Sequence, residues 1–231
     1  MNLDGWEEID SKSAEPAEQR ENDDPSPAYE DVVYRRQRKA DGPPQLHILG
    51  ATWGGVNVTA EVSAMVGDDE TLSLNMHTLH HSLQPDPVFG VVKTLTVLYR
   101  YDEGRGDVRL LNVPEYIPSE TLRITPTAHD EDAAGGYLAL VNNTTWREGQ
   151  VEILAVCYGP QRIKSPAVMR QLASYFEGRC GQIRMTNAFF TTDPWVGHRK
   201  SWSIYFRFVG SRRIQCVTGM EDGALETPWT R

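Results

Sequence analysis

Cysteine, long apolar runs and net positive charge are all scarce in this 231-residue sequence. Three scattered cysteines, Cys157, Cys180 and Cys216, form neither a disulfide framework nor a metal spacing, which favours a reducing, intracellular and cytoplasmic setting. The apolar runs span only a few residues, so we expect no transmembrane segment, and the acidic first eight residues lack the apolar core of a secretory signal. The net charge of −9 argues against nucleic acid as a partner.

Signatures of enzyme chemistry are also missing. The sequence has no G-x-S-x-G nucleophile turn, no P-loop and no dinucleotide-binding fingerprint, so we assign no catalytic residue and expect no cofactor. His77, His80 and His81 stand close together, but no cysteine or carboxylate has the spacing that would complete a metal site with them. We therefore interpret them as solvated or hydrogen-bonding histidines.

The negative charge is concentrated at one end of the chain. Residues 1–31 hold eleven Asp and Glu against Lys12 and Arg20, which amounts to the whole net charge of −9. They are rich in Pro, Ser, Glu and Asp, so they bury too little apolar surface to offset the entropy of ordering. We predict a disordered acidic tail that continues into a basic linker and ends at residue 44.

Three blocks of sequence recur in the same order, 105 to 107 positions apart. The paired blocks are 48–54 with 153–159, 86–101 with 193–208, and 108–115 with 214–221. Each pair is similar residue by residue, and the offset hardly drifts. The chain is therefore predicted to hold two repeats of one unit, 45–126 and 151–231, joined by a connector at 127–150.

The periodicity of these repeats predicts a mainly β fold. Alternating side chains over 94–101 and 201–208 are typical of strands in sheets with one buried face. Ser165-Pro166 is typical of a helix start, and the spacing that follows predicts a helix to Phe176, with a shorter counterpart over 60–66. Further strands are predicted over 71–76, 108–115, 137–141, 182–186 and 214–221.

The architecture follows from the size of each unit. About 80 residues bury little surface alone, so two β-sandwich-like repeats, each with one short helix, are expected to pack together.

The best-defined local feature is an Asp-Pro-x-x-Gly-x-x-Lys loop that occurs once in each repeat. Asp86 with Lys93 and Asp193 with Lys200 form two candidate polar sites for a ligand. The same residues also fit a purely structural role, because Asp-Pro starts a turn, glycine supplies a positive φ, and an Asp–Lys pair fixes the shape of the loop.

Two aromatic residues of these loops, Phe89 and Trp195, are candidate contacts for a partner. We expect them to hold the same position in the two loops, as exposed anchors or as plugs at the ends of the sandwich.

Several of these motifs resemble a known domain. Trp53-Gly54, Asn57-Val58-Thr59, the Asp86 to Tyr99 block and Glu120 to Ile124 are similar to a domain of unknown function that ends a subfamily of mitochondrial DnaJ-type proteins. The same domain also occurs alone or duplicated in fungal proteins. The resemblance implies a fold and carries no enzymatic residue. His129-Asp130 lacks the surroundings of a J-domain, so no co-chaperone role is implied.

The tail contains a short linear motif candidate. Asp4-Gly5-Trp6-Glu7-Glu8-Ile9 resembles the autophagy-receptor motif that binds ubiquitin-like Atg8-type proteins, with Trp6 and Ile9 entering two pockets.

Taken together, the sequence predicts a non-enzymatic binding or scaffold module for a protein or carbohydrate partner. One alternative is an enzyme with a cleft between the repeats that carries His198, Asp193 and Tyr158. Another is an autophagy-related adaptor that acts through the tail.

Overall fold

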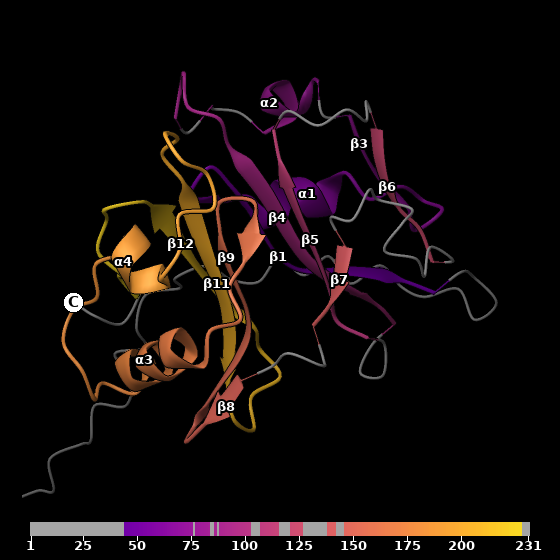
Figure 1. The fold of residues 1–231 in the computed structure, drawn as a ribbon. Coiled ribbons are helices and arrows are strands. Elements are labelled where there is room, and N and C mark those ends of the chain that lie inside the picture. The colour runs from indigo at the N-terminus through magenta and orange to yellow at the C-terminus, as the bar shows by residue number, and fades with distance from the viewer. Residues whose placement is uncertain are drawn as a thin grey trace, which may run out of the picture. The chain divides into compact units, whose positions relative to one another are not determined.

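The computed structural model describes residues 44–75, 77–83, 86, 88–102, 107–115, 121–126, 138–141 and 146–227 (Figure 1). The predicted tail and linker lie outside the described residues except for Pro44. Within the described residues the fold is mainly β with a few short helices, as the sequence predicts.

Two antiparallel sheets dominate the structure, and their strands follow the same order. The first sheet runs β2-β1-β4-β5-β7, and the second runs β10-β9-β11-β12, with β8 also paired to β9. The strands of the first sheet are β1 (Leu46–Trp53), β2 (Val56–Asn57), β4 (Thr94–Tyr101), β5 (Arg109–Pro114) and β7 (Leu138–Leu140). Those of the second are β8 (Trp146–Glu148), β9 (Val151–Tyr158), β10 (Gln161–Arg162), β11 (Ser201–Phe208) and β12 (Gln215–Met220).

Each sheet is accompanied by two short helices rather than the single helix predicted. Helices α1 (Thr59–Ala64) and α2 (Leu79–Ser82) go with the first sheet, and α3 (Pro166–Phe176) and α4 (Asn187–Phe190) with the second. The sequence pattern missed α2 and α4 because four residues are too few to show a helical period. Thr186 caps α4 by accepting a hydrogen bond from Phe189 N–H (3.2 Å).

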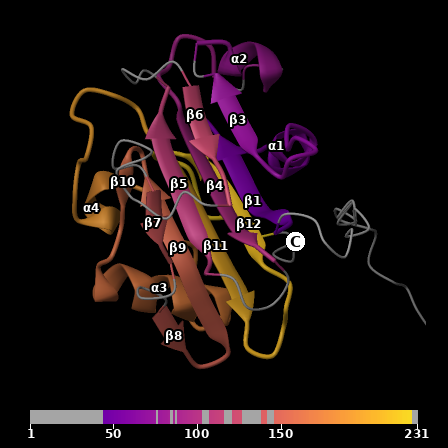
Figure 2. The same ribbon diagram turned by 90° about the vertical axis from the view of Figure 1, so that its right-hand side faces the viewer.

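The two sheets face each other, and helices cover their outer faces (Figures 1 and 2). One core joins α1, α2 and the small β3–β6 ladder (Leu72–Asn75 with Thr121–Ile124) to the outer side of the first sheet. A second joins α3 and α4 to the outer side of the second sheet. A third lies between the sheets and includes Leu98, Leu154 and Tyr205. The sandwich is therefore built between the two halves, with one sheet from each.

This arrangement corrects the expectation of strands with one buried face. The first six residues of β4 and of β11 are all buried, on both sides of the strand. One side meets the opposite sheet and the other meets the helical layer, so the polar members of the alternation, such as Thr96 and Ser203, are enclosed between the sheets.

A strand predicted over 182–186 is also absent. Arg184 makes only an isolated bridge to Ala224. The partner segment leaves β12 through a turn closed by Gly223 N–H donating to Met220 C=O (3.0 Å), so it pairs only around Ala224. The predicted strand over 137–141 is present as β7, whereas β8 was not foreseen.

Buried hydroxyl groups join the two sheets. The Thr52 hydroxyl lies 2.5 Å from that of Thr96 and 2.6 Å from that of Ser203, and the Thr96 hydroxyl lies 2.5 Å from that of Tyr205. The ring of Tyr205 lies where a side chain on Gly50 would be, because a Cβ there would meet it at 2.8 Å. The interface thus depends on a glycine opposite a tyrosine and on a fully paired set of hydroxyls.

Candidate functional site

Lys200, immediately before β11, is held in a polar cage that we call the second lysine clamp (Lys200, Asp193 and Glu221). Its Nζ lies 2.9 Å from Asp193 Oδ1 and 3.2 Å from Glu221 Oε2. It also donates to the backbone C=O of His198 (2.8 Å) and of Trp195 (3.4 Å). The side chain is only 2% exposed. Its three N–H donors are therefore fully used inside the protein.

Lys93 makes the same contacts before β4, in the first lysine clamp (Lys93, Asp86 and Glu115). Its Nζ lies 3.3 Å from Asp86 Oδ2 and 3.4 Å from Glu115 Oε2. It donates to the backbone C=O of Val91 (2.9 Å) and of Val88 (3.4 Å) and is 4% exposed. The two clamps therefore match contact by contact.

In each clamp, backbone hydrogen bonds join the lysine to the glutamate, and an aromatic ring lies beneath the ammonium group. Lys200 N–H donates to Glu221 Oε2 (3.2 Å), and Glu221 N–H donates to Lys200 C=O (2.7 Å). Lys200 Nζ lies 5.4 Å from the ring centroid of Tyr158, and Lys93 Nζ lies 5.7 Å from that of Trp53. The ring faces attract the ammonium groups and shield them from water.

The lysine also sets the protonation of the carboxylates in the second clamp. The hydrogen bond from Lys200 lowers the pKa of Asp193, with help from the Trp195 N–H. Burial acts to raise the pKa of Glu221, but hydrogen bonds from Tyr158 and Lys200 outweigh it, so this pKa is also lowered. Both carboxylates are thus held in the charged form that pairs with the ammonium.

The candidate residues Asp86, Lys93, Asp193 and Lys200 are accordingly brought together in pairs, but they bind one another. Asp86 Oδ1 accepts from Val88 N–H (3.0 Å) in the turn that the Asp-Pro sequence predicts. This engagement supports the structural interpretation of the loop. The sequence pattern missed Glu115 and Glu221, although both end the third recurring block and were visible there.

The predicted aromatic pair needs a correction. Phe89 and Trp195 do not hold the same position, because Val88 and Trp195 are the residues whose carbonyls accept from the clamp lysines. Phe89 corresponds to Val196, directly before the glycine. Phe89 is 94% exposed and Val196 79% exposed, whereas Trp195 is half-buried with its ring tilted against His198, 4.9 Å between centroids.

The two loops lie at one end of the sandwich, which we call the loop end (residues 86–93 and 193–200, as far as described). Thr96 is the third residue of β4 and Ser203 the third of β11, and both bind the Thr52 hydroxyl, so the strands begin at the same level. Figures 1 and 2 show the loops that lead into β4 and β11 at the same end of the sheets. Gly90 and Gly197 have φ of +75° and +79°, as the turn requires.

The residues of the enzyme alternative are partly dispersed. The Tyr158 hydroxyl donates to Glu221 Oε1 (2.6 Å), and the Tyr158 hydroxyl oxygen also lies 2.7 Å from Asn187 Oδ1. Asn187 Nδ2 in turn donates to Asp193 Oδ2 (3.3 Å), so Tyr158 and Asp193 are linked. The imidazole of His198 packs on Trp195 instead. All three side chains therefore already have partners within the second half.

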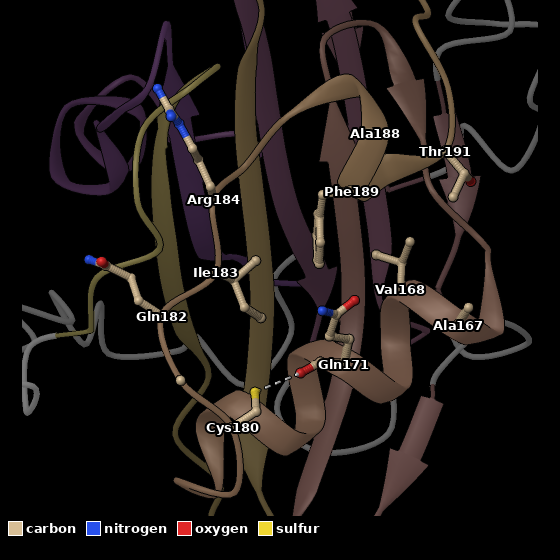
Figure 3. A pocket seen from close by; sticks show the side chains of 11 residues that line it. Ala167, Val168, Gln171, Cys180, Gln182, Ile183, Arg184, Ala188, Phe189 and Thr191 are labelled. Carbon is tan, nitrogen blue, oxygen red and sulfur yellow. Dashed lines mark hydrogen bonds between the residues drawn. The ribbon is translucent and has the colours of Figure 1, made fainter.

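A cavity of about 570 Å³ lies in the second half, beside α3 and away from the opposite sheet (Figure 3). It is lined by residues of α3, α4 and the segment 180–184 that connects them. No sequence signal pointed to it, because its walls are ordinary helix and loop residues that only the tertiary fold brings together.

The remaining candidate residues that the structure describes are not arranged as a metal site. Among the described residues no group of three or more His, Cys, Asp or Glu side chains is placed to hold a metal ion. His77 and His81 are exposed and His80 half-buried, with the rings of His80 and His81 in contact. Burial raises the pKa of Cys157 to about 12, which fits an inert thiol. Trp6 and Ile9 lie outside the described residues.

The described part of the chain contains no helix with the length and apolar character to span a membrane. Comparisons of the chain with protein-family models, curated proteins and solved structures find no significant match. The resemblance to the domain at the end of DnaJ-type proteins therefore stays a prediction.

Proposed function

We propose that the protein is a non-enzymatic binding module that holds a protein partner at the loop end. The observation that carries this proposal is the exposure of Phe89 and Val196, large apolar side chains at corresponding loop positions. Transfer of a phenylalanine side chain from water into an apolar pocket is worth about 1.5–3 kcal/mol. These two side chains, which we call the apolar tips, lie at one end of the molecule and fit apolar pockets on a partner surface.

The lysine clamps support this role by holding the tips in place. A flexible loop loses entropy when it binds, whereas a loop fixed beforehand does not. Lys93 and Lys200 each tie the start, the middle and the end of their loop together through a carboxylate, two carbonyls and the strand that follows. The clamps thus serve binding indirectly, by preorganising the apolar tips.

A protein partner fits better than a carbohydrate. Recognition of a sugar needs polar groups free to bond its hydroxyls, as well as a flat aromatic ring. The carboxylates of Asp86 and Asp193 are held by the lysines and by backbone N–H groups, and Trp195 is covered by His198. The loop end therefore offers a ligand the apolar side chains of Phe89 and Val196, with Arg199 as an exposed charged group.

Two copies of one unit, as the sequence predicts, would explain why the tips come in a pair. The common strand order and the matching contacts of the two clamps support this duplication. A duplicated site gives two weak contacts at fixed spacing, and their combined affinity exceeds that of either alone.

A photocrosslinking amino acid placed at position 89 or 196 of the full chain tests the proposal. We expect both positions to crosslink to the same partner, and we expect the purified partner to bind the chain. The double variant Phe89→Ser/Val196→Ser should weaken that binding at least tenfold, while the matched control Phe89→Leu/Val196→Ile retains it. A partner that binds the serine variant as well as the wild type would overturn the proposal, as would equal crosslinking from exposed position 164.

A further inference from the structure

The cavity beside α3 is lined by polar and apolar groups in similar measure, with the amide of Gln171 near its middle and one charged residue on its wall. Figure 3 shows Val168, Ile183 and Phe189 pointing toward its middle, while Gln182 and Arg184 point away from it. Eleven described residues line the cavity, and none of them is Asp or Glu. The space of about 570 Å³ is large enough for one or two apolar side chains of a ligand.

One wall of the cavity is an extended segment whose backbone is paired on a single edge. Met185 N–H donates to Gly223 C=O (2.9 Å), and Ile183 C=O accepts from Leu225 N–H (2.8 Å). In an antiparallel pair the next residue, Arg184, directs its N–H and C=O to the opposite edge, and so does Gln182. Within the described residues, these backbone groups of Gln182 and Arg184 have no hydrogen-bond partner. They form a short open edge of the kind that accepts an added strand.

Charge specifies the ligand further. Arg184 is exposed, and its Nε donates to the backbone C=O of Asp222 (3.1 Å), which fixes the guanidinium without neutralising it. A carboxylate on the ligand is the natural partner for its remaining N–H groups.

We propose that this groove binds an extended peptide of a partner protein, which adds as a strand along residues 182–184. Because side chains alternate along a strand, a peptide residue opposite Ile183 points into the cavity, and its neighbours point toward the side chain of Arg184. The peptide therefore contains an apolar residue next to an acidic residue. Its backbone pairs with residues 182–184, its apolar side chain enters the cavity, and its carboxylate binds Arg184. This site is separate from the loop end and does not depend on the function proposed for it.

A displayed library of random heptapeptides, selected against the full chain, provides the probe. We expect selected peptides to contain an apolar residue next to Asp or Glu. Arg184→Glu should weaken their binding at least tenfold. Arg199→Glu, a charge reversal at an exposed residue of the loop end, should leave it unchanged. The double variant Phe89→Ser/Val196→Ser should also bind the peptides normally, which separates this test from that of the loop end.

Amide hydrogen exchange supplies a readout specific to strand addition. The N–H groups of Gln182 and Arg184 should become at least tenfold more protected when a selected peptide binds, and those of Ile183 and Met185 should change less. Peptides that bind without protecting Gln182 and Arg184 would overturn the proposal. So would a selection that yields no peptide, or self-association of the chain that protects the same two amides.

Discussion

Removal of the Lys200 ammonium is expected to destabilise the protein strongly. Lys200→Met keeps the length of the side chain but leaves the carboxylates of Asp193 and Glu221, at 2.9 and 3.2 Å from Nζ, facing each other without a cation. The loss of one partner from a buried ion pair costs about 3–5 kcal/mol. Asp193 is 33% exposed and remains partly solvated, so we expect the lower end of this range, about 3 kcal/mol.

The midpoint of thermal unfolding should fall accordingly. A chain of this size loses roughly 2–4 °C for each kcal/mol, so the expected decrease is about 6–12 °C. Urea unfolding followed by tryptophan fluorescence measures the free energy directly. Lys164→Met, which removes an exposed lysine, is the matched control and should change the free energy of unfolding by less than about 0.5 kcal/mol.

A second substitution distinguishes lost charge pairing from lost packing. Glu221→Gln in the Lys200→Met background removes one of the two unpaired charges and should recover at least about 1 kcal/mol. If the free energy of unfolding of Lys200→Met lies within about 1 kcal/mol of the wild-type value, the clamp contributes little to stability. That result would refute the argument that the clamp fixes the loop.

Two further predictions concern acid and the turn glycine. The pKa values of Asp193 and Glu221 lie below their usual 3.8 and 4.5, so the folded state binds protons less readily than the unfolded state. Stability should therefore be complete above about pH 4.5 and decline as the pH falls below it, with a smaller decline for Glu221→Gln in acid titrations of the unfolding midpoint. Gly197→Val should lower the free energy of unfolding by about 1–3 kcal/mol, because φ is +79° there. Gly181→Ala, at a glycine without positive φ and with open space around it, should be nearly neutral in urea unfolding. Equal costs of the two substitutions would contradict the argument from backbone strain.

Local signals in the sequence located the strands that carry the clamps. The segments of alternating side chains, 94–101 and 201–208, match β4 and β11 residue for residue. The regular period of two identifies each strand, and the turn residues beside it mark where the strand begins. Asp-Pro and the glycine of each loop predicted the turn, since their backbone preferences act within four residues. The common strand order of the two halves also follows from the recurring blocks.

The candidate site was only half visible in the same way. Asp193 and Lys200 were identified because they belong to one loop, whereas Glu221 joins them across 21 positions through the pairing of β11 with β12. The sequence identifies Phe89 as an apolar loop residue, but the predicted counterpart, Trp195, is wrong, and Val196 holds that position. The alignment of 86–101 with 193–208 already pairs Phe89 with Val196, and the contacts of Val88 and Trp195 with the lysines agree with it.

The sequence by itself located β4 and β11 and the turns that lead into them. The tertiary structure decided which faces are buried, because the polar members of β4 and β11 become enclosed only when the other sheet covers them. It also decided how each lysine is held, since the aspartate and the two carbonyls come from the lysine's own loop but the glutamate directly follows the strand that pairs alongside. Local preferences act over a few residues and can be read in order along the chain. Burial and charge pairing depend on groups that meet only after the sheets have packed.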